Sequence, residues 1–292
     1  MASTNTPISD TKIELGDGRT LGYAVWGDPT GTPVMLFHGS PGSRLLCPDA
    51  TITSKCSVRL IATDRPGYGN SDPQRGRWLT EWPADVEQLA DRLGLDRFAV
   101  LGWSGGGPHA LACAAVLPER VGSVGLIASP GPTDEVPGVL DTDVQRRMVY
   151  DGSLSDRAGT TQAIIDFLEP VDGNDGGRWL EAVRSQFPDA VVYGDPVWEQ
   201  NFNEHVIEGM RAGGEGRAED AVASWGPWGF DPADVRTPTF AWYGGNDDNV
   251  VREHFDYLSS TLPTCTPIFR PEDSHVCIYN RWQEILHAIS AA

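Results

Sequence analysis

Residues 98–117 read FAVLGWSGGGPHALACAAVL, a short apolar run, a glycine-rich turn and a segment rich in alanine and leucine. The pattern predicts a β-strand that turns sharply into an α-helix, with Ser104 at the tip. Such a turn needs neighbours without a Cβ atom, which Gly102 and Gly105 supply, with Gly106 behind them. We therefore interpret Ser104 as a nucleophile exposed above a sheet edge; the alternative is a serine that caps a helix in a glycine-rich turn.

The composition predicts a soluble globular protein. The chain has 292 residues, 40% of them hydrophobic, which suits one large α/β domain with an insertion or two domains. No stretch approaches the roughly 20 apolar residues of a membrane helix. The first ten residues are small and polar, without the features of a secretory signal, so we expect a cytoplasmic location.

The formal net charge of −19, with Lys12 and Lys55 the only lysines, disfavours nucleic acid and anionic membranes as partners. We expect a small-molecule substrate as the partner, and the oligomeric state stays open. Five scattered cysteines without C-x-x-C spacing indicate neither a disulfide framework nor a zinc site. Dinucleotide, phosphate-loop and H-E-x-x-H motifs are absent from the sequence, so we expect no cofactor and no metal.

Apolar runs that alternate with helical spacing predict a mostly parallel sheet covered by helices. A hairpin is expected to open the fold around the turn at residues 16–19. The predicted strands are 12–15, 20–26, 33–37, 58–62, 98–101, 121–128, 237–243 and 266–270, and the predicted helices are 84–93, 104–117, 253–260 and 279–289.

Residues 131–231 interrupt this alternation. They read as short helices separated by glycine and proline, with apolar spacing around 163–168, 179–187 and 202–210. We interpret them as a helical cap inserted into a core of residues 1–130 and 232–292, with 1–10 flexible. The segment holds 20 Asp and Glu residues against 7 Arg, a net charge of −13. This is typical of a solvated face; the alternative is a pocket mouth that disfavours anionic substrates.

A serine hydroxyl is a weak nucleophile unless a base accepts its proton, and the base must be oriented by an acceptor on its other nitrogen. Among the six histidines, only His275 lies in a loop after a late strand, in the segment PEDSHV. We expect it to be the base, the alternative being a histidine of a surface loop. The segment GGNDDNV, residues 244–250, also follows a strand and offers two adjacent carboxylates as the acid, Asp247 and Asp248.

The turn around Ser104, the His38-Gly39 loop, the turn at 64–69 and the stretch 244–250 together resemble the α/β-hydrolase superfamily over nearly the whole chain. The resemblance implies an α/β-hydrolase fold, with a mostly parallel central sheet and an inserted helical cap. It also implies an acid three residues after a glycine and three before a valine. Asp247 and Asp248 both match, and the asparagine just before Val250 favours Asp247.

An oxyanion needs fixed backbone donors. We expect one from Gly105, the residue after the nucleophile, and the resemblance points to Ser40 for the other. His38 is expected to brace its loop by hydrogen bonds, Trp103 to pack into the core or the pocket wall, and Tyr68 is a weaker candidate for the pocket.

The resulting hypothesis is a serine hydrolase of the Ser-His-Asp type that cleaves carboxylic esters, lactones or thioesters of small to medium neutral substrates. A serine at this turn argues against dehalogenase or epoxide hydrolase activity, because those relatives carry an aspartate there. Two alternatives stay open. One is other chemistry at the same site, such as C–C or amide bond hydrolysis, cyclisation or perhydrolysis. The other is a receptor-like binding protein with a vestigial site.

Overall fold

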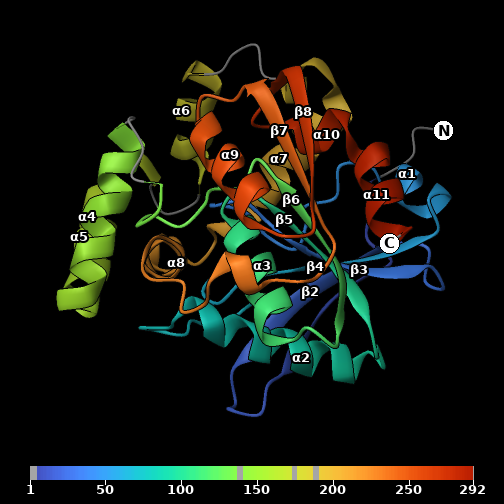
Figure 1. Cartoon of the computed structure of the whole chain (residues 1–292), viewed down its shortest axis with the longest axis horizontal. Coiled ribbons are helices and arrows are strands. Elements are labelled where there is room, and N and C mark those ends of the chain that lie inside the picture. The colour runs from blue at the N-terminus through green and yellow to red at the C-terminus, as the bar shows by residue number, and fades with distance from the viewer. Residues whose placement is uncertain (1–4, 137–140, 173–175, 187–190, 292) are drawn as a thin grey trace.

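The computed structural model describes residues 5–136, 141–172, 176–186 and 191–291. Its centre is an eight-stranded sheet in the order β1-β2-β4-β3-β5-β6-β7-β8 (Figure 1). The β1–β2 and β2–β4 pairs are antiparallel and the other pairs are parallel, which confirms the expected sheet and the opening hairpin. The strands are β1 Ser9–Glu14, β2 Thr20–Gly27, β3 Thr32–Phe37, β4 Val58–Thr63, β5 Phe98–Trp103, β6 Val121–Ile127, β7 Thr239–Asn246 and β8 Cys265–Ser274.

The ends of the chain differ in detail from the prediction. Pairing in β1 begins at Ser9, so the last two residues of the segment expected to be flexible belong to the sheet. The single helix predicted over 279–289 is two helices, α10 Cys277–Asn280 and α11 Trp282–Ser290. The backbone changes direction at Arg281, whose guanidinium pairs with Asp273 of β8.

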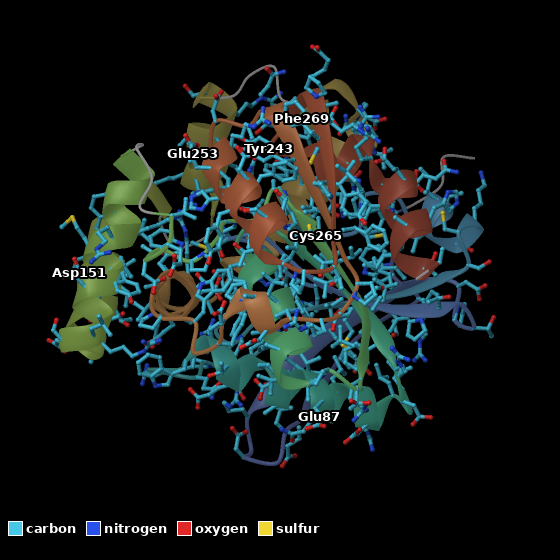
Figure 2. All side chains as sticks on the ribbon, in the orientation of Figure 1. Glu87, Asp151, Tyr243, Glu253, Cys265 and Phe269 are labelled. Atoms are coloured by element: carbon cyan, nitrogen blue, oxygen red, sulfur yellow. The ribbon has the colours of Figure 1, made fainter. Side chains whose placement is uncertain are left out.

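Helices cover both faces of the sheet because the central strand β5 is buried along its whole length, as parallel strands require. One face packs against α2 Trp82–Arg92, α3 Gly106–Val116 and α9 Arg252–Thr261, and the other against α1 Ala50–Lys55 and α11. Tyr243 and Phe269 lie on adjacent strands beneath α9 (Figure 2), and the Tyr243 ring stacks on Phe255 of that helix with 5.3 Å between centroids.

Between β6 and β7 the chain forms α-helices and two short 3-10 turns, Val191–Gly194 and Pro232–Asp234, in the part that the structure describes. These helices are α4 Asp141–Ser155, α5 Arg157–Asp172, α6 Gly177–Gln186, α7 Pro196–Gly209 and α8 Glu215–Trp225. In Figure 1, α8 lies between the sheet and the pair α4 and α5. Val149, Ile164 and Val222 of these three helices share a small apolar core. Phe187, the end of one predicted apolar segment, lies outside the described residues. We propose that residues 131–231 form the cap.

Helix α7 joins the cap to the core through aromatic contacts. Phe202 and His205 contact the Trp103 ring at the end of β5, with centroids 6.5 and 6.0 Å away. His205 is fully buried, and neither ring nitrogen has a hydrogen-bond partner among the described residues. Burial lowers the pKa of His205 to about 3 from its ordinary value of 6.5. The ring therefore packs as a neutral group.

The buried His205 predicts a loss of stability in acid. Below its ordinary pKa of 6.5 the imidazole is protonated in the unfolded chain but stays neutral in the folded one until the pH approaches about 3. The free energy of unfolding should therefore fall by up to about 1.4 kcal/mol per pH unit on this account. His205→Met removes the titration at similar volume. Urea unfolding between about pH 6 and pH 4 should show a shallower pH dependence for the variant; parallel curves would contradict the assignment.

Candidate active site

Ser104 lies where β5 turns into α3, with the left-handed φ of 51° that a non-glycine residue rarely adopts. Its backbone N–H donates to the Ile127 carbonyl of β6 at 2.8 Å. A Cβ atom on Gly102 would lie 2.3 Å from the Gly106 carbonyl oxygen, and one on Gly105 would lie 2.7 Å from the Ser40 hydroxyl oxygen. The glycines are thus required by the close approach of strand, helix and neighbouring loop.

His275 and Asp247 are brought together by the pairing of β7 with β8. Asn246, the last residue of β7, pairs with Ser274, the last residue of β8, beyond an irregularity near Gly244. Asp247 and His275 are the residues that follow directly. Strand β8 runs to Ser274, beyond the predicted end at residue 270, because this pairing continues. Parallel pairing therefore places both side chains at the same edge of the sheet as Ser104.

The three side chains form a hydrogen-bonded chain. His275 Nε2 lies 2.9 Å from Ser104 Oγ, and His275 Nδ1 lies 2.9 Å from Asp247 Oδ2 and 3.1 Å from Oδ1. The Asp247 side chain is fully buried and that of His275 is 15% exposed. With the proton on Nδ1 bonded to the carboxylate, Nε2 is free to accept the hydroxyl proton.

Asp247 is further fixed by the backbone. Its Oδ1 accepts hydrogen bonds from the N–H groups of Asn249 and Val250, both at 2.9 Å. Asp248, the other candidate, is exposed and makes no hydrogen bond to His275. The backbone of His275 is also fixed, because Trp103 Nε1 donates a hydrogen bond to the His275 carbonyl at 3.0 Å. Of the two carboxylates, the structure places Asp247 against the histidine.

The loop after β3 lies against the turn around Ser104. A Cβ atom on Gly39 would be 3.5 Å from the Ser104 Cβ, and one on Gly105 would be 3.6 Å from the Ser40 backbone nitrogen. The N–H groups of Ser40 and Gly105 donate to no group among the described residues. Both residues line the cavity that contains Ser104. Two backbone donors next to a serine hydroxyl suit the binding of an oxyanion.

His38 braces this loop, as expected. Its Nδ1 lies 2.6 Å from the Gly39 carbonyl oxygen, and its Nε2 accepts the Arg65 backbone N–H at 3.3 Å. Burial, together with the charge of Arg65, keeps the pKa of His38 well below 6.5, so the ring is neutral. Tyr68, the weaker candidate for the pocket, is instead buried behind the loop, and its hydroxyl lies 3.5 Å from Ser40 Oγ.

Sequence reasoning missed two residues behind this loop. Asp220 of α8 accepts a hydrogen bond from the Ser40 hydroxyl at 2.6 Å, and the Arg65 guanidinium contacts both at 2.7 and 2.9 Å. Asp220 reads as one more acidic residue of a helix, and Arg65 as part of a turn. The one available signal was the position of Arg65 directly after Asp64 at the carboxyl end of a buried strand.

A cavity of about 1260 Å³ opens over Ser104 between the sheet edge and the cap. Its walls are mostly apolar and aromatic. The charged residues Asp156, Asp248, Glu272, Asp273, Arg146 and Arg217 also line it. Two tryptophans of the segment 131–231, Trp179 and Trp225, line the cavity, whereas Trp198 and Trp228 of the same segment do not. The volume exceeds the range of many small-molecule sites and accommodates a substantial apolar group.

Within the described residues, no group of three or more His, Cys, Asp or Glu side chains is placed to hold a metal ion, and all five cysteines are free. No helix in that part of the chain has the length and apolar character needed to cross a bilayer.

Comparisons with known proteins extend these observations. A segment of 113 residues is 34% identical to part of a proline iminopeptidase of Xanthomonas citri. The alignment covers 38% of this chain and 36% of that relative, so the chain matches only about a third of the relative's length. The enol-lactonase of Burkholderia xenovorans LB400 superposes with a TM-score of 0.64 at 18% identity, covering 96% of this chain and 98% of that one. The esterase RhEst1 of a Rhodococcus species gives 0.63 at 19% identity, covering 98% and 99%. At such identities the two structures show the fold alone.

The sequence model of the α/β-hydrolase fold family matches residues 32–263. This range runs from the first parallel strand to the end of the loop before β8, and it includes the turn at Ser104, Asp247 and the segment 131–231. The mostly parallel sheet and the position of the site at the strand ends are consistent with this match. The chain therefore belongs to the α/β-hydrolase fold family.

Proposed function

We propose that this protein is a serine hydrolase that cleaves carboxylic esters, lactones or thioesters through an acyl-enzyme. The observation that carries the proposal is the continuous chain from Ser104 Oγ through His275 to the buried Asp247, with 2.9 Å at each step. A serine at this turn bonded to an imidazole, which is itself bonded to a carboxylate, is the arrangement that activates a hydroxyl.

In the proposed reaction, Ser104 Oγ forms a bond to the substrate carbonyl carbon while its proton passes to His275 Nε2. The carbonyl electron pair moves to oxygen, where the N–H groups of Ser40 and Gly105 bind it, each worth about 3 kcal/mol when well placed. When the tetrahedral intermediate collapses, Nε2 returns the proton to the leaving alcohol or thiol. Water then attacks the acyl-enzyme with the same base and releases the acid. Asp247 keeps the required tautomer and stabilises the imidazolium.

The cavity favours a neutral substrate that carries an apolar group. Aromatic and aliphatic side chains such as Trp179, Phe202 and Ile164 line it from the cap side. Small to medium esters fit, and the volume leaves room for a bulkier acyl or alcohol part.

Amide hydrolysis is the second candidate, because one relative of this chain is a proline iminopeptidase. The same acyl-enzyme would serve, with the proton delivered to an amine instead of an alcohol. A substrate ammonium group would need a free carboxylate beside it. Asp273 at the cavity wall is buried but already paired with Arg281. The other wall carboxylates, Asp156, Asp248 and Glu272, are exposed. Such exposed carboxylates bind a cation weakly, which ranks the ester first.

Ser104→Ala should abolish turnover of short-chain p-nitrophenyl esters and time-dependent labelling by a fluorophosphonate, because the alanine has no oxygen to acylate. Ser129→Ala is the matched control. Ser129 is a buried serine just beyond the neighbouring strand β6, and within the described residues its hydroxyl bonds only to the Pro130 carbonyl. Labelling is measured by mass spectrometry.

If the unaltered protein takes no label, the proposal fails and the receptor-like alternative is favoured. Labelling without turnover of esters, lactones, thioesters or amides in a mixed panel would instead indicate a narrower reaction at the same serine.

Asp247→Asn should lower kcat by about 10⁴-fold, because an amide next to Nδ1 favours the wrong imidazole tautomer. Asp248→Asn should change kcat by less than about threefold, since Asp248 is exposed and does not bond to His275. Steady-state kinetics with one ester compare the two. A larger loss for Asp248→Asn would show that the wrong carboxylate had been assigned.

A further inference from the structure

Behind the loop that carries Ser40 lies a buried ionic cluster that joins the cap to the core. Asp220 of α8 is fully buried. Its Oδ1 accepts hydrogen bonds from Arg65 Nε at 2.9 Å and Arg77 Nη2 at 2.6 Å, and its Oδ2 accepts from Arg65 Nη2 at 2.7 Å and Ser40 Oγ at 2.6 Å. His109 Nε2 of α3 lies 3.2 Å from Oδ1. One cap carboxylate thus contacts three separate parts of the core.

The Asp220 carboxylate in this cluster stays ionised at neutral pH. Burial acts to raise the pKa of Asp220, but the charge and hydrogen bonds of the Arg65 guanidinium outweigh it and hold that pKa well below its usual range. Burial keeps the pKa of His109 lowered, so this ring contributes no charge near neutrality. Arg65, Arg77 and Asp220 together carry one net positive charge directly behind the Ser40 loop.

Arg65 is the member of the cluster that reaches the backbone of the loop. Its Nη1 donates to the His38 carbonyl, and its Nη2 donates to the Gly39 carbonyl at 3.2 Å and to the Ser40 hydroxyl at 2.9 Å. The Gly39 carbonyl and the Ser40 N–H belong to one planar peptide group. A cation that bonds to the carbonyl oxygen therefore fixes the plane of this peptide and polarises its N–H, which becomes a stronger donor.

The Ser40 side chain has no role left for the substrate. Its hydroxyl donates to Asp220, accepts from Arg65 and lies 3.5 Å from the Tyr68 hydroxyl, so its proton and its acceptor positions face groups of the cluster. What Ser40 presents to the cavity is its backbone N–H, which donates to no other described residue.

We propose that Arg65 is a positioning residue that orients and polarises the Gly39–Ser40 peptide for oxyanion binding, and that Asp220 of the cap holds its guanidinium in place. The inference rests on the proposed serine hydrolase function and deepens it. Because Asp220 belongs to α8, docking of this cap helix and alignment of the oxyanion donor are one event. A lysine at position 65 keeps the charge but cannot form the planar fork.

Arg65→Lys should lower kcat for a p-nitrophenyl ester by about 10- to 100-fold with KM changed by less than about twofold, because oxyanion donors act in the transition state. The inhibition constant of an alkylboronic acid, which forms a tetrahedral adduct on Ser104, should rise by a similar factor. Arg77→Lys is the matched control. Arg77 is equally buried and bonds to the same carboxylate, but in the described part of the chain it makes no hydrogen bond to the Ser40 loop.

For Arg77→Lys, kcat and the boronate constant should stay within about twofold of the unaltered enzyme, even if thermal unfolding shows that both variants are less stable. Equal losses in the two variants would reduce the cluster to a structural role and overturn the proposal, as would normal kcat in a folded Arg65→Lys. If Arg65→Lys does not fold, Asp220→Asn replaces it, with an expected fall of kcat of about 3- to 10-fold at unchanged KM. An unaltered enzyme that neither takes the fluorophosphonate label nor hydrolyses esters would overturn the proposed function itself, and this inference with it.

Discussion

The left-handed backbone of Ser104 is the constraint on which the site depends. Such a conformation costs about 1–3 kcal/mol in a residue with a side chain and persists only when its surroundings enforce it. Here β5 is held on both sides by β3 and β6, the Ser104 N–H is bonded to Ile127, and Gly102 leaves room for the start of α3. Because the turn is fixed by the sheet, the hydroxyl points toward His275 before any substrate arrives.

The parallel sheet gathers the remaining groups. Ser40, Ser104, Asp247 and His275 follow β3, β5, β7 and β8, and the carboxyl ends of these parallel strands face one edge. Residues distant in sequence therefore meet without long loops. Helices α3 and α11 pack on opposite faces of the sheet and so support this edge from both sides.

The order of strands and helices was predictable, because buried runs such as 98–101 and punctuating glycines are local signals. Asp247 was predictable from its place after a strand together with a family resemblance. The extension of β8 to Ser274 was not, since it depends on pairing with β7 across an irregularity. Asp220 was beyond sequence reasoning altogether. An acidic side chain on a helix in a segment of net charge −13 is typical of a solvated face, and only its partners Arg65 and Arg77 reveal that it is buried.

The helices of the proposed cap therefore fall into two groups that contact different parts of the site. Helices α7 and α8 contact the machinery directly, through Phe202 on Trp103 and through Asp220 on Arg65, so a change there alters the geometry of the site. Helices α4 and α5 contribute Val149 and Ile164 to the cavity wall, and these side chains touch no proposed catalytic residue. Substitutions of these two side chains can reshape the cavity, and they act on the proposed oxyanion donor only indirectly, through the apolar core shared with Val222 of α8. A fold that keeps its chemistry and changes its substrates needs this separation, because specificity then varies without loss of the activated serine.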